Sequence, residues 1–250
     1  MPSDITNRDA VKGLIENIRK TMPPIAGVAN GAMVLQDTAI SDMDIDIMKR
    51  VLAPKVDGSR YLNELFQTDN LDFFILLSSI ATVFGQHGQS NYTAANMFLN
   101  GLVAQRRRNG LVGSVMVIGA IVGIGYFERE VDEITKDRVI KAGYRMMSER
   151  DFHLLFSEAI YAGRDNSEQS YEVITGLREI KEDEDRLAQN PLFHQVISRK
   201  GAANAVKETS AKVQLRAQIQ VATTDDEVKE VIQGKYTMSQ KQFCHNTAAW

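Results

Sequence analysis

Four apolar runs that alternate with helix-like segments constrain the fold of this chain more than any other feature. The runs lie at 25–29, 71–77, 114–122 and 171–175. Between them, segments 42–66, 92–109 and 148–162 carry apolar residues at the three- and four-residue spacing of an amphipathic helix. Strands alternating with helices form βαβ units, and strands that are apolar on both faces belong in a covered parallel sheet. The sequence therefore predicts an α/β fold with a Rossmann-like, doubly wound and mainly parallel sheet flanked by helices.

Helix boundaries follow from capping and breaking residues. A further helix is expected at 4–22, with Asp4 or Thr6 as its N-cap. Pro54 lies inside the helix predicted at 42–66 and is expected to kink or interrupt it. The basic run at 106–108 is interpreted as a solvated helix end, where positive charge is favourable.

Composition and charge limit the classes of binding partner, the kinds of site and the cellular location that we expect. The 250 residues carry a net charge of -3, which favours neither nucleic acid nor an anionic membrane as a partner. No apolar run approaches the roughly 20 residues that span a bilayer. Cys244 is the single cysteine and the four histidines lack ligand-like spacing, so we expect no disulfide framework and no metal site. A cytoplasmic location is the expectation.

A change of composition near residue 197 predicts two parts. Residues 1–196 carry the strand and helix patterns, whereas 197–250 begins with a small, polar stretch. We interpret 197–250 as a linker followed by a poorly ordered end.

Polar residues gather where the predicted strands end, which is where parallel sheets bind ligands. Asn30-Gly31 follows the first strand and Ser79 closes the second. Tyr92 and Asn96 are four residues apart at the start of a helix, so they share one face. Lys55 lies in the preceding helix and can flank the same strand end.

This set resembles the ketoreductase domains of polyketide synthases, which are similar to short-chain dehydrogenases. The matching stretches are 25–35, 52–58, 76–79, 85–96 and 143–153, and the resemblance covers roughly residues 4–196. Ordinary short-chain dehydrogenases carry a lysine four residues after the tyrosine. In the polyketide ketoreductases an asparagine takes that place and the lysine comes from the earlier helix, as Asn96 and Lys55 do here. Stretches 25–35 and 143–153 look most like fungal highly reducing synthases, including hybrids with peptide synthetases.

The resemblance implies four catalytic residues. Tyr92 would be the general acid that protonates the carbonyl oxygen. The ammonium of Lys55 would lower the tyrosine pKa from its usual value of about 10. Ser79 would hold the substrate carbonyl, and Asn96 would support the proton relay.

The resemblance also implies NADPH as cofactor, bound by Asp4, Asn30, Gly31, Lys55 and Tyr92. No glycine-rich turn precedes Asp4, whereas in the family the preceding chain supplies that turn and the first strands. We therefore expect a partial Rossmann-like sheet without its first strands, an exposed sheet edge, and weakened cofactor binding.

The implied function is reduction of a carrier-bound β-ketoacyl thioester to the β-hydroxyacyl form with NADPH, in fungal secondary metabolite (polyketide) biosynthesis. The implied partners are an acyl carrier domain with its phosphopantetheine-bound chain and other synthase domains. Residues 214–228 resemble the lead-in to a carrier domain that is then cut short. Two alternatives stay open: an inactive synthase fragment that binds no cofactor, and a free-standing short-chain dehydrogenase.

Overall fold

A computed structural model describes residues 3–141, 144–164, 167, 169–177, 180–181, 186–193 and 197–198. The chain divides into two units, Met1–Arg178 and Glu179–Trp250. In the second unit, β5 (Ile180–Lys181) pairs in parallel with β6 (Ile197–Ser198), and two short 3-10 helices are η1 (Arg186–Gln189) and η2 (Pro191–Phe193). The predicted linker and carrier lead-in lie outside the described residues, apart from Ile197–Ser198, and stay predictions.

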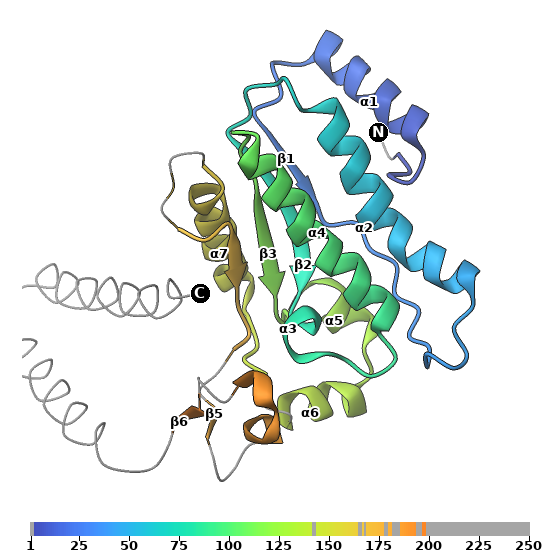
Figure 1. Ribbon diagram of the computed structural model, residues 1–250, viewed down its shortest axis with the longest axis vertical. Helices are drawn as coiled ribbons and strands as arrows, with labels where there is room; N and C mark the ends of the chain where they lie inside the picture. The colour runs from blue at the N-terminus through green and yellow to red at the C-terminus, as the bar shows by residue number, and fades with distance from the viewer. Residues whose placement is uncertain are drawn as a thin grey trace, which may run out of the picture. The chain divides into compact units, whose positions relative to one another are not determined.

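The first unit is built on a four-stranded parallel sheet, which confirms the predicted fold class (Figure 1). Its strands are β1 (Gly27–Asn30), β2 (Phe73–Ser79), β3 (Ser114–Ile118) and β4 (Glu172–Ile174), in the order β1-β2-β3-β4. The register places Ala29 opposite Ile75, and Leu77 opposite Met116. Within the described residues β1 pairs with β2 alone, so β1 forms one edge of this sheet.

Helices cover both faces of the sheet, which explains why its strands are apolar throughout. Three long helices, α1 (Arg8–Thr21), α2 (Ile45–Leu65) and α4 (Ser90–Arg108), contribute to one core layer. The other layer packs against α7 (Glu149–Ala162). Successive strand residues point to opposite layers, so Leu76 joins the first and Ile75 the second. Short helices α3 (Ala81–Phe84), α5 (Gly125–Glu130) and α6 (Glu133–Lys141) complete the described part of this unit.

Two local predictions differ from the structure, the N-cap of the first helix and the interruption at Pro54. The N-cap of α1 is Asn7, whose side chain accepts from the amide of Ala10, because Asp4 instead accepts from the amide and hydroxyl of Thr6. Helix α2 runs from Ile45 to Leu65 through Pro54, so the proline does not interrupt it. Buried residues from Val51 to Leu62, on both sides of Pro54, hold the helix together where a backbone hydrogen bond is lost.

The basic end of α4 is only partly solvated, which corrects the interpretation of 106–108. The side chain of Arg106 is 1% exposed, and its guanidinium lies 4.0 Å from the ring centroid of Phe74. It donates to the carbonyl oxygens of Val112 and Phe66 and to Oδ1 of Asn63. Burial lowers the pKa of Arg106 to about 10. This buried cation therefore joins the C-terminal ends of α2 and α4.

None of the helices in the described residues has both the length and the apolar character required to cross a bilayer.

Candidate active site

The structure brings Lys55 and Tyr92 together beside the end of β2. Lys55 lies on the inner face of α2, is 3% exposed, and donates from Nζ to the carbonyl oxygen of Leu77 at 2.7 Å. Its Nζ lies 5.6 Å from the ring centroid of Tyr92, which is buried near the start of α4. Helix α2 therefore delivers a cation to the tyrosine that the sequence singled out.

Burial makes the ammonium of Lys55 unusually easy to deprotonate. Transfer of a charged group out of water disfavours its charged form, and desolvation lowers the pKa of Lys55 to about 8. A lysine held this way is expensive for the fold and is typical of functional sites. The ordinary interpretation of a lysine in a helix, a solvated charge, does not apply here.

Burial raises the pKa of the Tyr92 phenol, whereas the resemblance predicted that this pKa would be lowered. Desolvation raises its pKa, while hydrogen bonding with Asn96 and Ser79 works against that rise. The predicted net lowering of the Tyr92 pKa was therefore wrong, because burial outweighs any stabilisation of the phenolate by Lys55, whose ammonium lies over the ring and donates to Leu77. The hydroxyl of Tyr92 donates to Sδ of Met33 at 3.7 Å. The phenol therefore stays protonated at neutral pH.

Ser79 and Asn96 both lie close enough to Tyr92 to influence its pKa. Ser79 is the last residue of β2, and its Oγ accepts from the amide of Ala81 at 3.2 Å. Asn96 is fully buried and donates from Nδ2 to the carbonyl oxygen of Tyr92 at 2.8 Å. Its Oδ1 has no donor among the described residues. An acceptor buried in this way costs about 1–3 kcal/mol, so this oxygen has the capacity to accept from a further partner.

Asn30 has a structural role that sequence reasoning missed. Its Nδ2 donates to Oγ of Ser59 at 2.9 Å and to the carbonyl oxygen of Pro54 at 3.2 Å, so it joins β1 to α2. Its Oδ1 accepts from the amide of Ala32 at 3.0 Å and shapes the turn at Gly31. A side chain on Gly31 would meet Cδ2 of Leu77 at 3.3 Å. Contact with a ligand at this turn would therefore come from its backbone.

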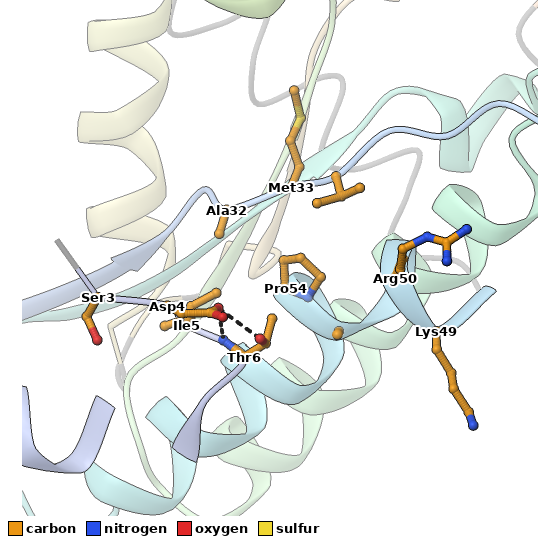
Figure 2. Close-up of a pocket in the computed structure, with 11 residues that line it drawn as sticks. Ser3, Asp4, Ile5, Thr6, Ala32, Met33, Lys49, Arg50 and Pro54 are labelled. Carbon is orange, nitrogen blue, oxygen red and sulfur yellow. Dashed lines mark hydrogen bonds between the residues drawn. The ribbon is translucent and has the colours of Figure 1, made fainter. Parts of the chain in front are cut away.

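A cavity of about 640 Å³ opens next to this turn (Figure 2). Its lining residues come from the N-terminal segment, the stretch after β1, and α2: Ser3, Asp4, Ile5, Thr6, Ala32, Met33, Val34, Lys49, Arg50, Ala53 and Pro54. Asp4, predicted as a cofactor contact, is among them. Figure 2 shows Lys49 and Arg50 extending away from Asp4 and Thr6. Volumes of about 300–1,000 Å³ are usual for small-molecule sites, and this space lies within that range.

A clasp of hydrogen bonds between three pairs of residues ties segment 36–38 to residues 88–91, just before Tyr92, and sequence reasoning missed it. The amide of Thr38 donates to the carbonyl oxygen of Gly88 at 2.8 Å, and Nε2 of Gln89 donates to the carboxylate of Asp37 at 3.0 Å. Nδ2 of Asn91 donates to the carbonyl oxygen of Gln36 at 3.1 Å. Gly88 has a φ of 76°, a value that favours glycine. The glycine at this position is the sequence signal that could have pointed to the clasp.

The sequence of this chain is similar to a known domain family and to parts of large fungal synthetases. The family described as KR domain matches residues 1–123. The hybrid PKS-NRPS synthetase poxE of Penicillium oxalicum is 47% identical over 234 residues, and mycA of Thermothelomyces thermophilus is 43% identical over 239. These alignments cover 92% and 94% of this chain, which spans 6% of the length of each synthetase.

Two solved ketoreductases share the architecture. One, from the first module of phoslactomycin biosynthesis in Streptomyces sp. HK803, is 26% identical with a TM-score of 0.67, covering 80% of this chain and 45% of that one. An A-type ketoreductase from a modular polyketide synthase is 25% identical with a TM-score of 0.64, covering 84% and 41%. The family match, the synthetases and these structures agree, and the chain belongs to the KR domain family of polyketide synthases.

Proposed function

We propose that this site reduces the β-ketone of an acyl thioester to a hydroxyl group, with NADPH as the hydride donor. The observation that carries the proposal is the buried ammonium of Lys55, 5.6 Å from the ring centroid of Tyr92 beside the end of β2. The relatives support it, because they are polyketide synthetases and ketoreductases.

Tyr92 would act as the general acid. Its raised pKa keeps the hydroxyl protonated at neutral pH, ready to donate to a carbonyl oxygen that gains negative charge. Donation leaves a phenolate, which the ammonium of Lys55 stabilises by its charge. Because the pKa of Lys55 is about 8, the lysine is mostly charged at pH 7. The pair can therefore release a proton and later recover it.

Ser79 and Asn96 would support this step. The hydroxyl of Ser79, at the end of β2, would donate to the same carbonyl oxygen and fix its orientation. The unpartnered Oδ1 of Asn96 would accept from a donor that resupplies the proton to Tyr92.

The described residues fit part of a nicotinamide dinucleotide. Lys55 and Tyr92 would hold the nicotinamide ribose, the backbone at Asn30 and Gly31 would border it, and Asp4 would face the adenine end of the cavity. NADPH supplies the hydride when bound; the protein places the carbonyl and controls the proton. The substrate would arrive on the phosphopantetheine arm of an acyl carrier domain, in the company of other synthase domains in the cytoplasm.

The test combines binding and turnover on the whole chain. NADPH is titrated by fluorescence, and a β-ketoacyl cysteamine thioester is offered as substrate. Tyr92→Phe should abolish turnover while leaving the fold intact, and Tyr161→Phe, at an exposed position of α7, is the matched control. A folded chain that binds no NADPH and reduces nothing would instead be an inactive fragment. Reduction of small ketones without thioesters would indicate a free-standing dehydrogenase.

A further inference from the structure

Met33 connects the cavity with the hydroxyl of Tyr92. Its side chain lines the cavity, is 37% exposed, and accepts the hydrogen bond from the Tyr92 hydroxyl at Sδ, 3.7 Å away. Figure 2 shows this side chain extending away from Asp4 and Thr6. The thioether therefore occupies the position in front of the phenol that a carbonyl oxygen needs if Tyr92 is to protonate it.

The contact is weak enough for a substrate to replace it. A thioether sulfur is a poor hydrogen-bond acceptor, whereas a carbonyl oxygen is a strong one. The Tyr92 hydroxyl would gain a better acceptor when a ketone enters. The exchange also needs no large rearrangement, because methionine has three rotatable bonds.

The backbone on both sides of Met33 is fastened, which limits the movement to the side chain. On the N-terminal side the amide of Ala32 donates to Oδ1 of Asn30 at 3.0 Å. On the C-terminal side the clasp joins Gln36, Asp37 and Thr38 to the loop before Tyr92. Met33 is thus a movable side chain on a fixed support, and after it swings aside it still borders the reacting carbonyl.

We infer that Met33 is a specificity-determining residue, which covers the Tyr92 hydroxyl in the substrate-free protein and then limits the room beside the reacting ketone. The inference rests on the proposed function. The preferred substrate class would be β-ketoacyl thioesters without a branch on the carbon between ketone and thioester. A smaller side chain at this position would admit the branched class.

The test compares two cysteamine thioesters, a 3-oxoacyl form and its 2-methyl-3-oxoacyl counterpart. Met33→Ala should raise the ratio of kcat/KM for the branched over the unbranched thioester about tenfold or more, because one methyl group in an apolar pocket is worth about 10- to 200-fold. Met33→Leu keeps the bulk and should leave the ratio within about threefold. Met22→Ala, at an exposed position after α1, is the control.

A second readout needs no turnover. Met33→Ala should open the phenol to water and lower the pKa of Tyr92 toward 10, followed as the tyrosinate absorbance that disappears in Tyr92→Phe backgrounds. Turnover with an unchanged ratio and an unchanged Tyr92 titration would overturn the role of Met33 and leave the reductase assignment intact. Absence of turnover with every thioester would overturn both.

Discussion

Replacing Lys55 with methionine should make the protein more stable at neutral pH while destroying its proposed activity. The lysine is buried on α2, and its pKa falls from 10.5 to about 8 because burial disfavours its charge. At about 1.4 kcal/mol for each pKa unit, this difference corresponds to about 3 kcal/mol of lost stability below pH 8. Methionine has a similar length and carries no charge, so it removes that penalty.

The hydrogen bond from Nζ to the carbonyl oxygen of Leu77 offsets part of the gain. A bond from a charged donor contributes about 1.5–3 kcal/mol, and Lys55→Met forfeits it. The expected net effect at pH 7 is therefore a stabilisation of about 1 kcal/mol. The net effect is the difference between the desolvation penalty and the energy of the lost hydrogen bond, two larger and opposing contributions. The pH dependence of stability tests the desolvation penalty by itself.

The sign of the pH dependence follows from the depressed pKa. Below pH 8 the lysine is charged in both folded and unfolded states, and the full penalty is present. Between pH 8 and 10.5 the unfolded chain binds more protons than the folded one, so the stability of the wild-type chain rises with pH. Above pH 10.5 the penalty is gone. The advantage of Lys55→Met should therefore shrink and reverse across this interval, a change of about 3 kcal/mol.

Urea denaturation followed by circular dichroism at pH 7 and pH 10.5 measures this change. Lys49→Met is the matched control, because Lys49 lies on the same helix and is exposed. Its stability difference from wild type should stay within about 0.5 kcal/mol across the same pH range. A Lys55→Met difference that is equal at the two pH values would refute the claim that Lys55 is a desolvated ammonium.

Three further predictions concern the frame around the site. Asn7→Ala removes the N-cap of α1 and should lower the free energy of unfolding by about 1 kcal/mol in urea titrations. Arg106→Met leaves three acceptors, one of them buried and two part-buried, without their donor and should cost about 3 kcal/mol in thermal or urea unfolding. Arg108→Met, at the exposed end of the same helix, should cost less than about 0.5 kcal/mol, and equal losses would contradict the buried role of Arg106. Asp37→Ala deprives Gln89 of its acceptor and should speed amide exchange at Thr38 with little change in global stability, measured by hydrogen exchange.

The parallel sheet could be predicted from sequence because each strand carries its own apolar signal. Strand β2 was expected from residue 71 and begins at Phe73, and α7 begins after Ser148, close to the expected start. The short helices α5 and α6 were not predicted. Helix α5 buries no residue, so it has no apolar periodicity to detect.

The proposed catalytic set was reachable from sequence only through the family pattern. Lys55, Ser79 and Tyr92 are far apart in the chain, and each alone has an ordinary structural explanation. The contacts of Asn30 and Met33 were out of reach, because they depend on where α2 and α4 pack against the sheet. The tyrosine pKa was misjudged for the same reason, since the depth of burial is a tertiary property.

Two buried cations in the described residues, Arg106 and Lys55, differ in how many hydrogen-bond acceptors surround them, and this difference fits two roles: stabilising the fold and the proposed proton transfer. Arg106, beside Phe74 near the start of β2, shares its donors among two carbonyl oxygens and an amide oxygen and stacks on an aromatic ring. Lys55, beside the end of β2, has three donors and makes one hydrogen bond within the described part of the chain, to Leu77.

A cation that only stabilises a fold is best surrounded by acceptors, because each unmet donor costs free energy. The saturated surroundings of Arg106 fit that role. Lys55 keeps donor capacity next to Tyr92, where a ribose hydroxyl and a developing phenolate would use it. The incomplete hydrogen bonding of Lys55 is therefore the physical reason to propose that catalysis takes place at this end of the strand.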